Sequence, residues 1–369
     1  MRTLVVSDLH LGANSRADLM RRPELRAPFI ATLREREIQR LVVLGDGLEL
    51  REVPVRIGTR HARDVFAEVG QALGEHGEVV VLAGNHDHAM LSRWHDARRL
   101  QDPPRAMEVE HRFAARMGGA LATQLAEAAA PAKLSLAYPG VWLRDDVYAT
   151  HGHYLDLHTT VPTIERLAAG AMERFVARIP EQAGPDDYEA TLAPLYAWAF
   201  VISQRATDQV SGAGRRGSQS AYRALTDGGA PVRRAAMRAG FFAAVQAINA
   251  AGIGPVAPKL SPVSLRRGSL EGMGEVVRRL GIDAAHVVFG HSHRPGPLPA
   301  DDLAEWRTPT GARLHNTGSW CYQPHFLGER PEASPYRPGT AVLLEDDGPP
   351  QLLHLLDDVS HATLRPPAA

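Results

Sequence analysis

The residues Val79-Val80-Val81-Leu82-Ala83-Gly84-Asn85-His86-Asp87 decide the fold of this chain. An unbroken apolar run stops at glycine, and side chains that can bind metal or move protons follow at once. Such uninterrupted runs are typical of strands buried on both faces, as in a parallel sheet. The stretch therefore predicts a central strand that carries chemical groups at its carboxyl end.

The same arrangement recurs at four other places, where a short apolar run leads directly into polar residues. These runs end in Asp8-Leu9-His10, Gly45-Asp46-Gly47-Leu48-Glu49, His151-Gly152-His153 and Gly290-His291-Ser292-His293. Open α/β sheets bind their ligands beyond the carboxyl ends of the strands. The five ends therefore predict one shared site.

Stretches with apolar residues at helical spacing separate the first three runs, from about 23 to 36 and from about 61 to 76. Alternating strands and helices of this kind build a parallel sheet with helices on its faces, so we expect an α/β fold. Residues 134–138 and 141–143 predict a hairpin around Pro139-Gly140. Residues 341–345 and 351–356 predict a second hairpin near the end of the chain.

The five polar blocks resemble those of the calcineurin-like metallophosphoesterases. The family patterns Asp-x-His, Gly-Asp-x-x-Asp/Glu, Gly-Asn-His-Asp/Glu, His-Gly and Gly-His-x-His all occur here, in the family order. The resemblance covers residues 1 to about 153 and about 265 to 358. It implies a four-layer α/β/β/α sandwich in which a second sheet lies opposite the first.

The middle of the chain has no counterpart in that resemblance, and its patterns are helical. Apolar residues recur at helical spacing over 164–179, 194–210 and 232–251, and the small, polar and basic stretch 211–220 predicts a mobile loop. We expect a catalytic core in two parts, 1–153 and 263–358, an inserted α-helical cap at 154–262, and a C-terminal tail at 359–369.

The resemblance implies two divalent cations that share one carboxylate. The implied ligands are Asp8, His10, Asp46 and His293 for one cation, and Asp46, Asn85, His151 and His291 for the other. A carboxylate such as Asp46 can bridge two cations roughly 3.5–4 Å apart. Mixed nitrogen and oxygen ligands favour Mn, Fe or Zn over Ca or Mg, and the sequence does not choose among the three.

The resemblance also implies a mechanism in which solvent is the nucleophile. Two such ions lower the pKa of a bridging water and offset charge on the phosphoryl group. His86 would protonate the leaving oxygen as general acid. Glu49 matches the family carboxylate that orients this histidine, although Asp is common at that position.

Several residues have a plain structural reading beside the functional one. Taken alone, Asp8 or Asp46 is a turn residue or a helix cap, and only the five blocks together favour metal. For His88 and His153 two interpretations remain: they contact groups near the site, or they are surface residues. Asp87 is expected to accept hydrogen bonds in a structural role. Four arginines are expected to be solvated, and the alternative is that they guide an anionic substrate: Arg205, Arg215, Arg216 and Arg223. Six apolar and aromatic residues are expected to form the core of the cap, and the alternative is a groove for an acyl chain: Leu195, Tyr196, Trp198, Phe200, Phe241 and Phe242.

The composition limits the kinds of partner that we expect for this chain. The chain has 369 residues, a formal net charge of -1 and a pI near 7.0, so nothing attracts it as a whole to nucleic acid or to an anionic membrane. Cys321 is the single cysteine, and no apolar leader precedes the first strand, so we expect a cytoplasmic protein without a membrane span. Peripheral membrane contact through the cap stays open, as does the oligomeric state.

Three functions compete. The leading one is a metallophosphoesterase that hydrolyses a phosphomonoester, phosphodiester or pyrophosphate, with lipid-linked and nucleotide substrates both open. Residues 7–12 also resemble the opening of the UDP-2,3-diacylglucosamine pyrophosphatase branch, but His86 departs from the pattern expected of that branch. A metal-dependent nuclease would need a basic stripe that this sequence lacks. A non-catalytic scaffold of the same fold would show gaps among its ligands, and none is visible.

Overall fold

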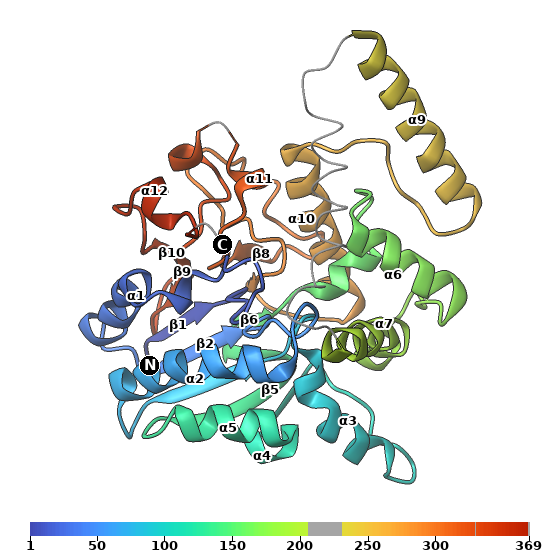
Figure 1. The fold of residues 1–369 in the computed structure, drawn as a ribbon. Helices are drawn as coiled ribbons and strands as arrows, with labels where there is room; N and C mark the ends of the chain where they lie inside the picture. The colour runs from blue at the N-terminus through green and yellow to red at the C-terminus, as the bar shows by residue number, and fades with distance from the viewer. Residues whose placement is uncertain (206–230, 329, 368–369) are drawn as a thin grey trace.

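A computed structural model describes residues 1–205, 231–328 and 330–367. Ten described strands form one mixed sheet in the order β10-β9-β1-β2-β3-β5-β6-β7-β8, with β4 paired to β5 (Figure 1). They are β1 (Thr3–Val6), β2 (Arg40–Leu44), β3 (Glu78–Leu82), β4 (Glu110–Ala114), β5 (Lys133–Arg144), β6 (Val147–Thr150), β7 (His286–Phe289), β8 (Arg313–Asn316), β9 (Thr340–Leu344) and β10 (Gln351–His354). β1, β2, β3 and the start of β5 run parallel, which confirms the α/β prediction.

The sheet has two halves that share β5. Residues 133–137 of this strand pair with β3, and residues 140–144 pair with β6. Val42 and Val80 from the first half pack with Val141 and Val288 from the second in one buried cluster. The two halves therefore face each other across an apolar layer.

The predicted hairpin around Pro139-Gly140 is wrong, because residues 133–144 form one continuous strand. Pro139 lies where β5 changes partners, and there the pairing with β4 shifts register at Glu110. A bulge of this kind tolerates proline, since no regular ladder bond needs its missing N–H.

Helices cover the outer face of each half. α1 (Pro23–Glu35), α2 (Val55–Leu73) and α5 (Ala120–Ala128) bury Phe29, Phe66 and Leu125 in the core on the outer face of the first half. α10 (Pro262–Arg279) buries Met273 and Val277 against the second half. Helices, two sheet halves and helices thus form the four layers that were expected.

The remaining helices are short or lie between β6 and β7. They are η1 (Leu19–Arg21), η2 (His88–Leu91), α3 (Ser92–Arg99), α4 (Ala115–Gly118), η3 (His153–Leu157), α6 (Ile164–Phe175), α7 (Pro185–Arg205), α9 (Pro231–Ala250), α11 (Pro324–Leu327), η4 (Pro331–Ala333) and α12 (His361–Leu364). α7 begins before Pro194, which was the predicted start and lies inside the helix. No helix in the described ranges is long and apolar enough to cross a membrane.

The segment predicted to be a cap contains α6, α7 and α9, and α9 projects away from the sheet (Figure 1). The predicted loop 211–220, which contains Arg215 and Arg216, lies outside the described residues. Arg223 also lies outside them. The boundaries of the core, the cap and the tail stay predictions.

Candidate metal centre

The loops that follow β1, β2, β3, β6 and β7 bring the predicted ligands together beyond the strand ends. The ligand atoms of Asp8, His10 and His293 lie within 4.8 Å of one another, and so do those of Asp46, His151 and His291. The remaining predicted ligand is Asn85, whose Oδ1 lies 3.3 Å from Nε2 of His151. The five strand ends therefore meet at one place, as the sequence predicted.

Electron-pair donors face one another in the first cluster. Nε2 of His293 lies 3.1 Å from Oδ1 of Asp8 and 3.3 Å from Nε2 of His10. Nδ1 of His10 is 3.1 Å from Oε2 of Glu49, and because a carboxylate only accepts, Nδ1 carries the hydrogen. The Nε2 atom of His10 therefore faces Asp8 and His293. A cation fits between these atoms.

The second cluster has the same character. His151 donates from Nδ1 to the main-chain oxygen of Leu44 at 2.9 Å, so Nε2 is the ring nitrogen that faces the cluster. Nε2 lies 3.4 Å from Oδ2 of Asp46. Nε2 of His291 lies 3.0 Å from both oxygens of Asp156, so its Nδ1 is left to face the cluster.

The amide of Asn85 lies between the second cluster and Arg51. Its oxygen lies 3.3 Å from Oδ2 of Asp46 and 3.2 Å from Nδ1 of His291, and its nitrogen lies 2.7 Å from Nη1 of Arg51. Without a cation this places acceptor against acceptor and donor against donor, and turning the amide over would satisfy both ends. In either orientation the side chain of Asn85 lies among the atoms of the second cluster.

Asp46 occupies the shared position. Its Oδ2 lies 3.4 Å from Nε2 of His151 in one cluster and 3.9 Å from Nε2 of His10 in the other. The side chain is 2 % exposed, so water does not screen its charge. One carboxylate oxygen therefore faces both clusters.

The charges of the site shift its pKa values strongly. Burial by itself would lower the pKa of His10 and of His151, but the carboxylates around them raise these values to about 9 and about 10. Glu49 is the largest such influence on His10, and Asp46 is the largest on His151. Burial would raise the pKa of Asp8, but His293 lowers it to about 2. The carboxylates thus attract positive charge, which two cations would supply.

Backbone strain gathers at the same residues. Among the described non-glycine residues with positive φ are Asp8 (54°), His10 (45°), Asp46 (50°), His291 (65°) and His293 (58°). Residues with side chains rarely adopt this conformation, and strain of this kind concentrates at functional sites. The strand ends therefore hold these side chains in a costly arrangement.

Gly84 lets two of the loops approach each other closely. A Cβ atom at this position would lie 2.2 Å from Oδ1 of Asp46 and 2.6 Å from Nε2 of His151. Only glycine leaves room for both side chains at these distances.

His86 and Glu49 lie beside the first cluster. Nδ1 of His86 is 2.8 Å from Oε2 of Glu49, the oxygen that His10 also contacts. Oε1 of Glu49 accepts from the main-chain N–H groups of Arg51 at 2.9 Å and Glu52 at 3.0 Å, so the carboxylate is fixed. Glu49 is fully buried, whereas the side chain of His86 is 20 % exposed. The contact predicted between these two residues is present, and their catalytic roles stay predictions.

Of the other residues singled out from the sequence, one agrees with its predicted role and two exclude one of their alternatives. Asp87 is buried and accepts from the N–H groups of Gly84 and Leu48, as expected of a structural acceptor. His88 and His153 are not surface residues, because both are buried. His88 bonds Glu189 of α7, a residue that no sequence pattern indicated.

The expectation that six aromatic and apolar residues form the core of the cap is only partly correct. Tyr196 is buried, whereas Trp198 is 65 % and Phe242 is 53 % exposed. Leu195, Phe200 and Phe241 are half-buried. Arg205, at the end of α7, is exposed, in agreement with the expectation that it is solvated.

Sequence reasoning missed two residues of the site. Arg51 lies next to the amide of Asn85, and Asp156 bonds His291. Both follow recognised blocks closely, two residues after Glu49 and five residues after His151. Charged residues so near a block of ligands were the available signal.

No protein family and no curated protein matches the chain in sequence. Among solved structures it is similar to the crystal structure of a dimetal phosphatase from Danio rerio. The TM-score is 0.36 and the sequence identity is 11 %, and the match covers 94 % of this chain and 93 % of that chain.

Proposed function

We propose that this chain is a hydrolase that cleaves phosphoester bonds with two divalent cations. The observation that carries the proposal is the carboxylate of Asp46, whose Oδ2 faces a histidine of each cluster. Asp8, His10 and His293 would hold one cation with it, and Asn85, His151 and His291 would hold the other. The mixed nitrogen and oxygen ligands favour Mn, Fe or Zn.

Bound cations would lower the pKa of a water molecule and neutralise negative charge on the phosphoryl oxygens. The side chains nearby supply the remaining steps. His86 would protonate the leaving oxygen from Nε2 while its Nδ1–H stays bonded to Glu49. The bond to Glu49 would fix the orientation of the imidazole.

Arg51 adds a group that binds phosphate. Its guanidinium lies at the amide of Asn85, at the edge of the second cluster. Guanidinium groups bind two phosphate oxygens at once through parallel N–H donors. We propose that Arg51 holds a non-bridging oxygen of the substrate.

We further propose that residues 154–262 form a cap that selects the substrate. In support, Oγ of Ser203 donates to the main-chain oxygen of Leu50 at 2.6 Å, and Oε1 of Gln204 accepts from the N–H of Val55 at 3.0 Å. These bonds attach the end of α7 to the chain just after Glu49. A helix in that position would border the path by which a phosphoester reaches Asp46.

Hydrolysis of bis-p-nitrophenyl phosphate and of p-nitrophenyl phosphate tests the proposal, first with Mn²⁺ and then after chelation. We expect cleavage that chelation abolishes and that added Mn²⁺ restores. The preferred ester distinguishes a phosphodiesterase from a phosphomonoesterase. Cleavage that survives complete removal of metal would contradict the proposal.

A further inference from the structure

We propose that His88, His95 and Glu189 form a separate site for one divalent cation of the zinc class. They come from η2, α3 and α7, and one ligand atom from each lies within 4.8 Å of the others. All three are buried, with exposed fractions of 9 %, 3 % and 4 %. This inference does not depend on the proposed phosphoesterase activity.

The distances suit a small cation. Oε2 of Glu189 lies 2.8 Å from Nε2 of His88 and 3.7 Å from Nε2 of His95. Zinc binds nitrogen and oxygen at 2.0–2.2 Å in a tetrahedron, which separates neighbouring ligand atoms by roughly 3.3 Å. The two observed distances lie on either side of that value, so small side-chain movements would complete the geometry. Two histidines and one glutamate form a known zinc ligand set that leaves a fourth position for water.

His95 is the residue that most needs a partner. Within the described residues, neither of its ring nitrogens makes a hydrogen bond, although both are buried. A buried polar atom without a partner destabilises the folded protein. Burial also lowers the pKa of His95 to about 4, so the ring is neutral at pH 7 and can offer a lone pair to a cation.

Glu189 is held in the orientation of a ligand. Its Oε1 accepts hydrogen bonds from the hydroxyl groups of Tyr138 at 2.5 Å and Tyr154 at 2.8 Å. These bonds direct Oε2 toward the two histidines. Residues that bond to a ligand in this way fix its orientation and strengthen metal binding.

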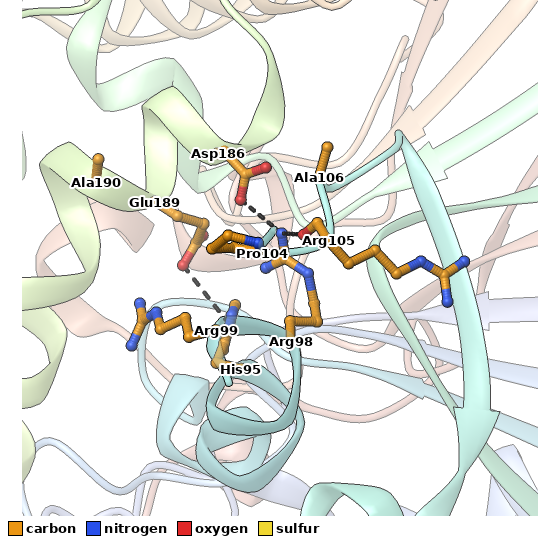
Figure 2. A pocket seen from close by; sticks show the side chains of 9 residues that line it. All are labelled: His95, Arg98, Arg99, Pro104, Arg105, Ala106, Asp186, Glu189 and Ala190. Atoms are coloured by element: carbon orange, nitrogen blue, oxygen red, sulfur yellow. Dashed lines mark hydrogen bonds and ion pairs between the residues drawn. The ribbon is translucent and has the colours of Figure 1, made fainter. Parts of the chain in front are cut away.

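A cavity gives access to the site. Its volume is about 310 Å³, and its lining includes His95, Glu189, Arg98 and Asp186. Figure 2 shows His95 and Glu189 directed toward each other at the cavity, with the ion pair of Arg98 and Asp186 beside them. The space admits a hydrated ion and a water molecule as the fourth ligand. A cation bound here would join α7 to the core, because its ligands come from both.

The test compares the full-length wild-type protein with His95→Phe. Each is stripped with chelator, dialysed against Zn²⁺ and analysed for bound metal, with circular dichroism to verify folding. We expect the variant to bind one zinc ion fewer per chain than the wild type. We also expect the zinc-induced rise in melting temperature to shrink. The control is His76→Ala, which removes an exposed histidine and should leave the zinc content and the rise in melting temperature unchanged.

The difference between the two proteins does not depend on how many ions bind elsewhere, so failure of the proposed function would not imitate failure of this site. In the chelated state, His95→Phe should be at least as stable as the wild type, because it removes two unpaired polar atoms. If the variant does not fold, Glu189→Gln serves instead, since it keeps an acceptor for both tyrosines and loses the charge. Equal zinc content in the wild type and a folded variant would overturn the proposal.

Discussion

Asp46 accepts a hydrogen bond at Oδ1 from the main-chain N–H of His86, at 2.8 Å. Its other oxygen faces both clusters of proposed metal ligands. The carboxylate therefore fixes the backbone of the proposed general acid relative to both cation positions. Any change at Asp46 should disturb metal binding and proton transfer together.

Asp46→Asn should lower metal content and turnover together. The amide removes the negative charge, and only one of its two ends is an oxygen that can face the cations. Loss of outer contacts to metal ligands typically weakens metal binding 10–100-fold, so we expect a loss of about 100-fold or more here. Metal analysis and hydrolysis assays measure the two effects. The control is Asp64→Asn on the exposed face of α2, and normal metal content in Asp46→Asn would contradict the shared position.

His86→Ala should lower turnover while metal content stays normal. A positioned general acid contributes roughly 10²–10⁴-fold. The loss should be greater for phenyl phosphate than for p-nitrophenyl phosphate, because a poorer leaving group depends more on protonation. A structural role for His86 would lower both rates equally, so the ratio of the two rates decides between the roles.

Gly84→Ala should remove bound metal. The added methyl group would lie 2.2 Å from Oδ1 of Asp46, so one of the two loops must move. The matched control is Gly240→Ala in α9, where a Cβ atom meets nothing within 4 Å among the described residues. The control should keep its activity. Unchanged metal content and activity in Gly84→Ala would show that the approach of the loops is not tight.

His315 should make the metal-free protein less stable in acid. Burial, the largest cause, together with His286 and Arg313 lowers its pKa from 6.5 to about 3. Below pH 6.5 His315 is protonated in the unfolded chain but stays neutral in the folded chain. The free energy of unfolding therefore falls as the pH drops from 6.5 toward 3. By pH 5 this contributes a loss of about 2 kcal/mol in the free energy of unfolding.

Urea unfolding at pH 7 and pH 5, with chelator present, measures this effect. His315→Gln should reduce the difference between the two pH values by about the same 2 kcal/mol, since glutamine does not titrate. The exposed His76, changed to Gln, provides the control. An unchanged difference in His315→Gln would show that His315 titrates normally in the folded protein.

The sequence predicted the parts of the molecule that local chemistry determines. Apolar runs that end in ligands identified β1, β2, β3, β6 and β7, because buried parallel strands have an unmistakable composition. The continuity of β5 was not predictable from Pro139, since proline usually interrupts a strand. The strand accommodates Pro139 because of the bulge opposite Glu110, which is a tertiary feature.

The contacts made by α7 were also beyond the sequence. Glu189 lies 101 residues from His88, and no local pattern indicates that the two side chains meet. Asp156 was missed for another reason. It lies close to a ligand block, but the side chain that it bonds, His291, is 135 residues away. Pairings of this kind are determined by how the layers pack and not by spacing along the chain.

The shared strand β5 has a consequence for how the protein opens. Its first part belongs to the half that carries Asp8, Asp46 and Asn85, and its last part belongs to the half that carries His151 and His291. Neither half can lose its register without disturbing the other, because one stretch of backbone completes both. The slowest amide protons of β2 and β7 should therefore exchange with deuterated solvent at a single common rate, as one cooperative unit.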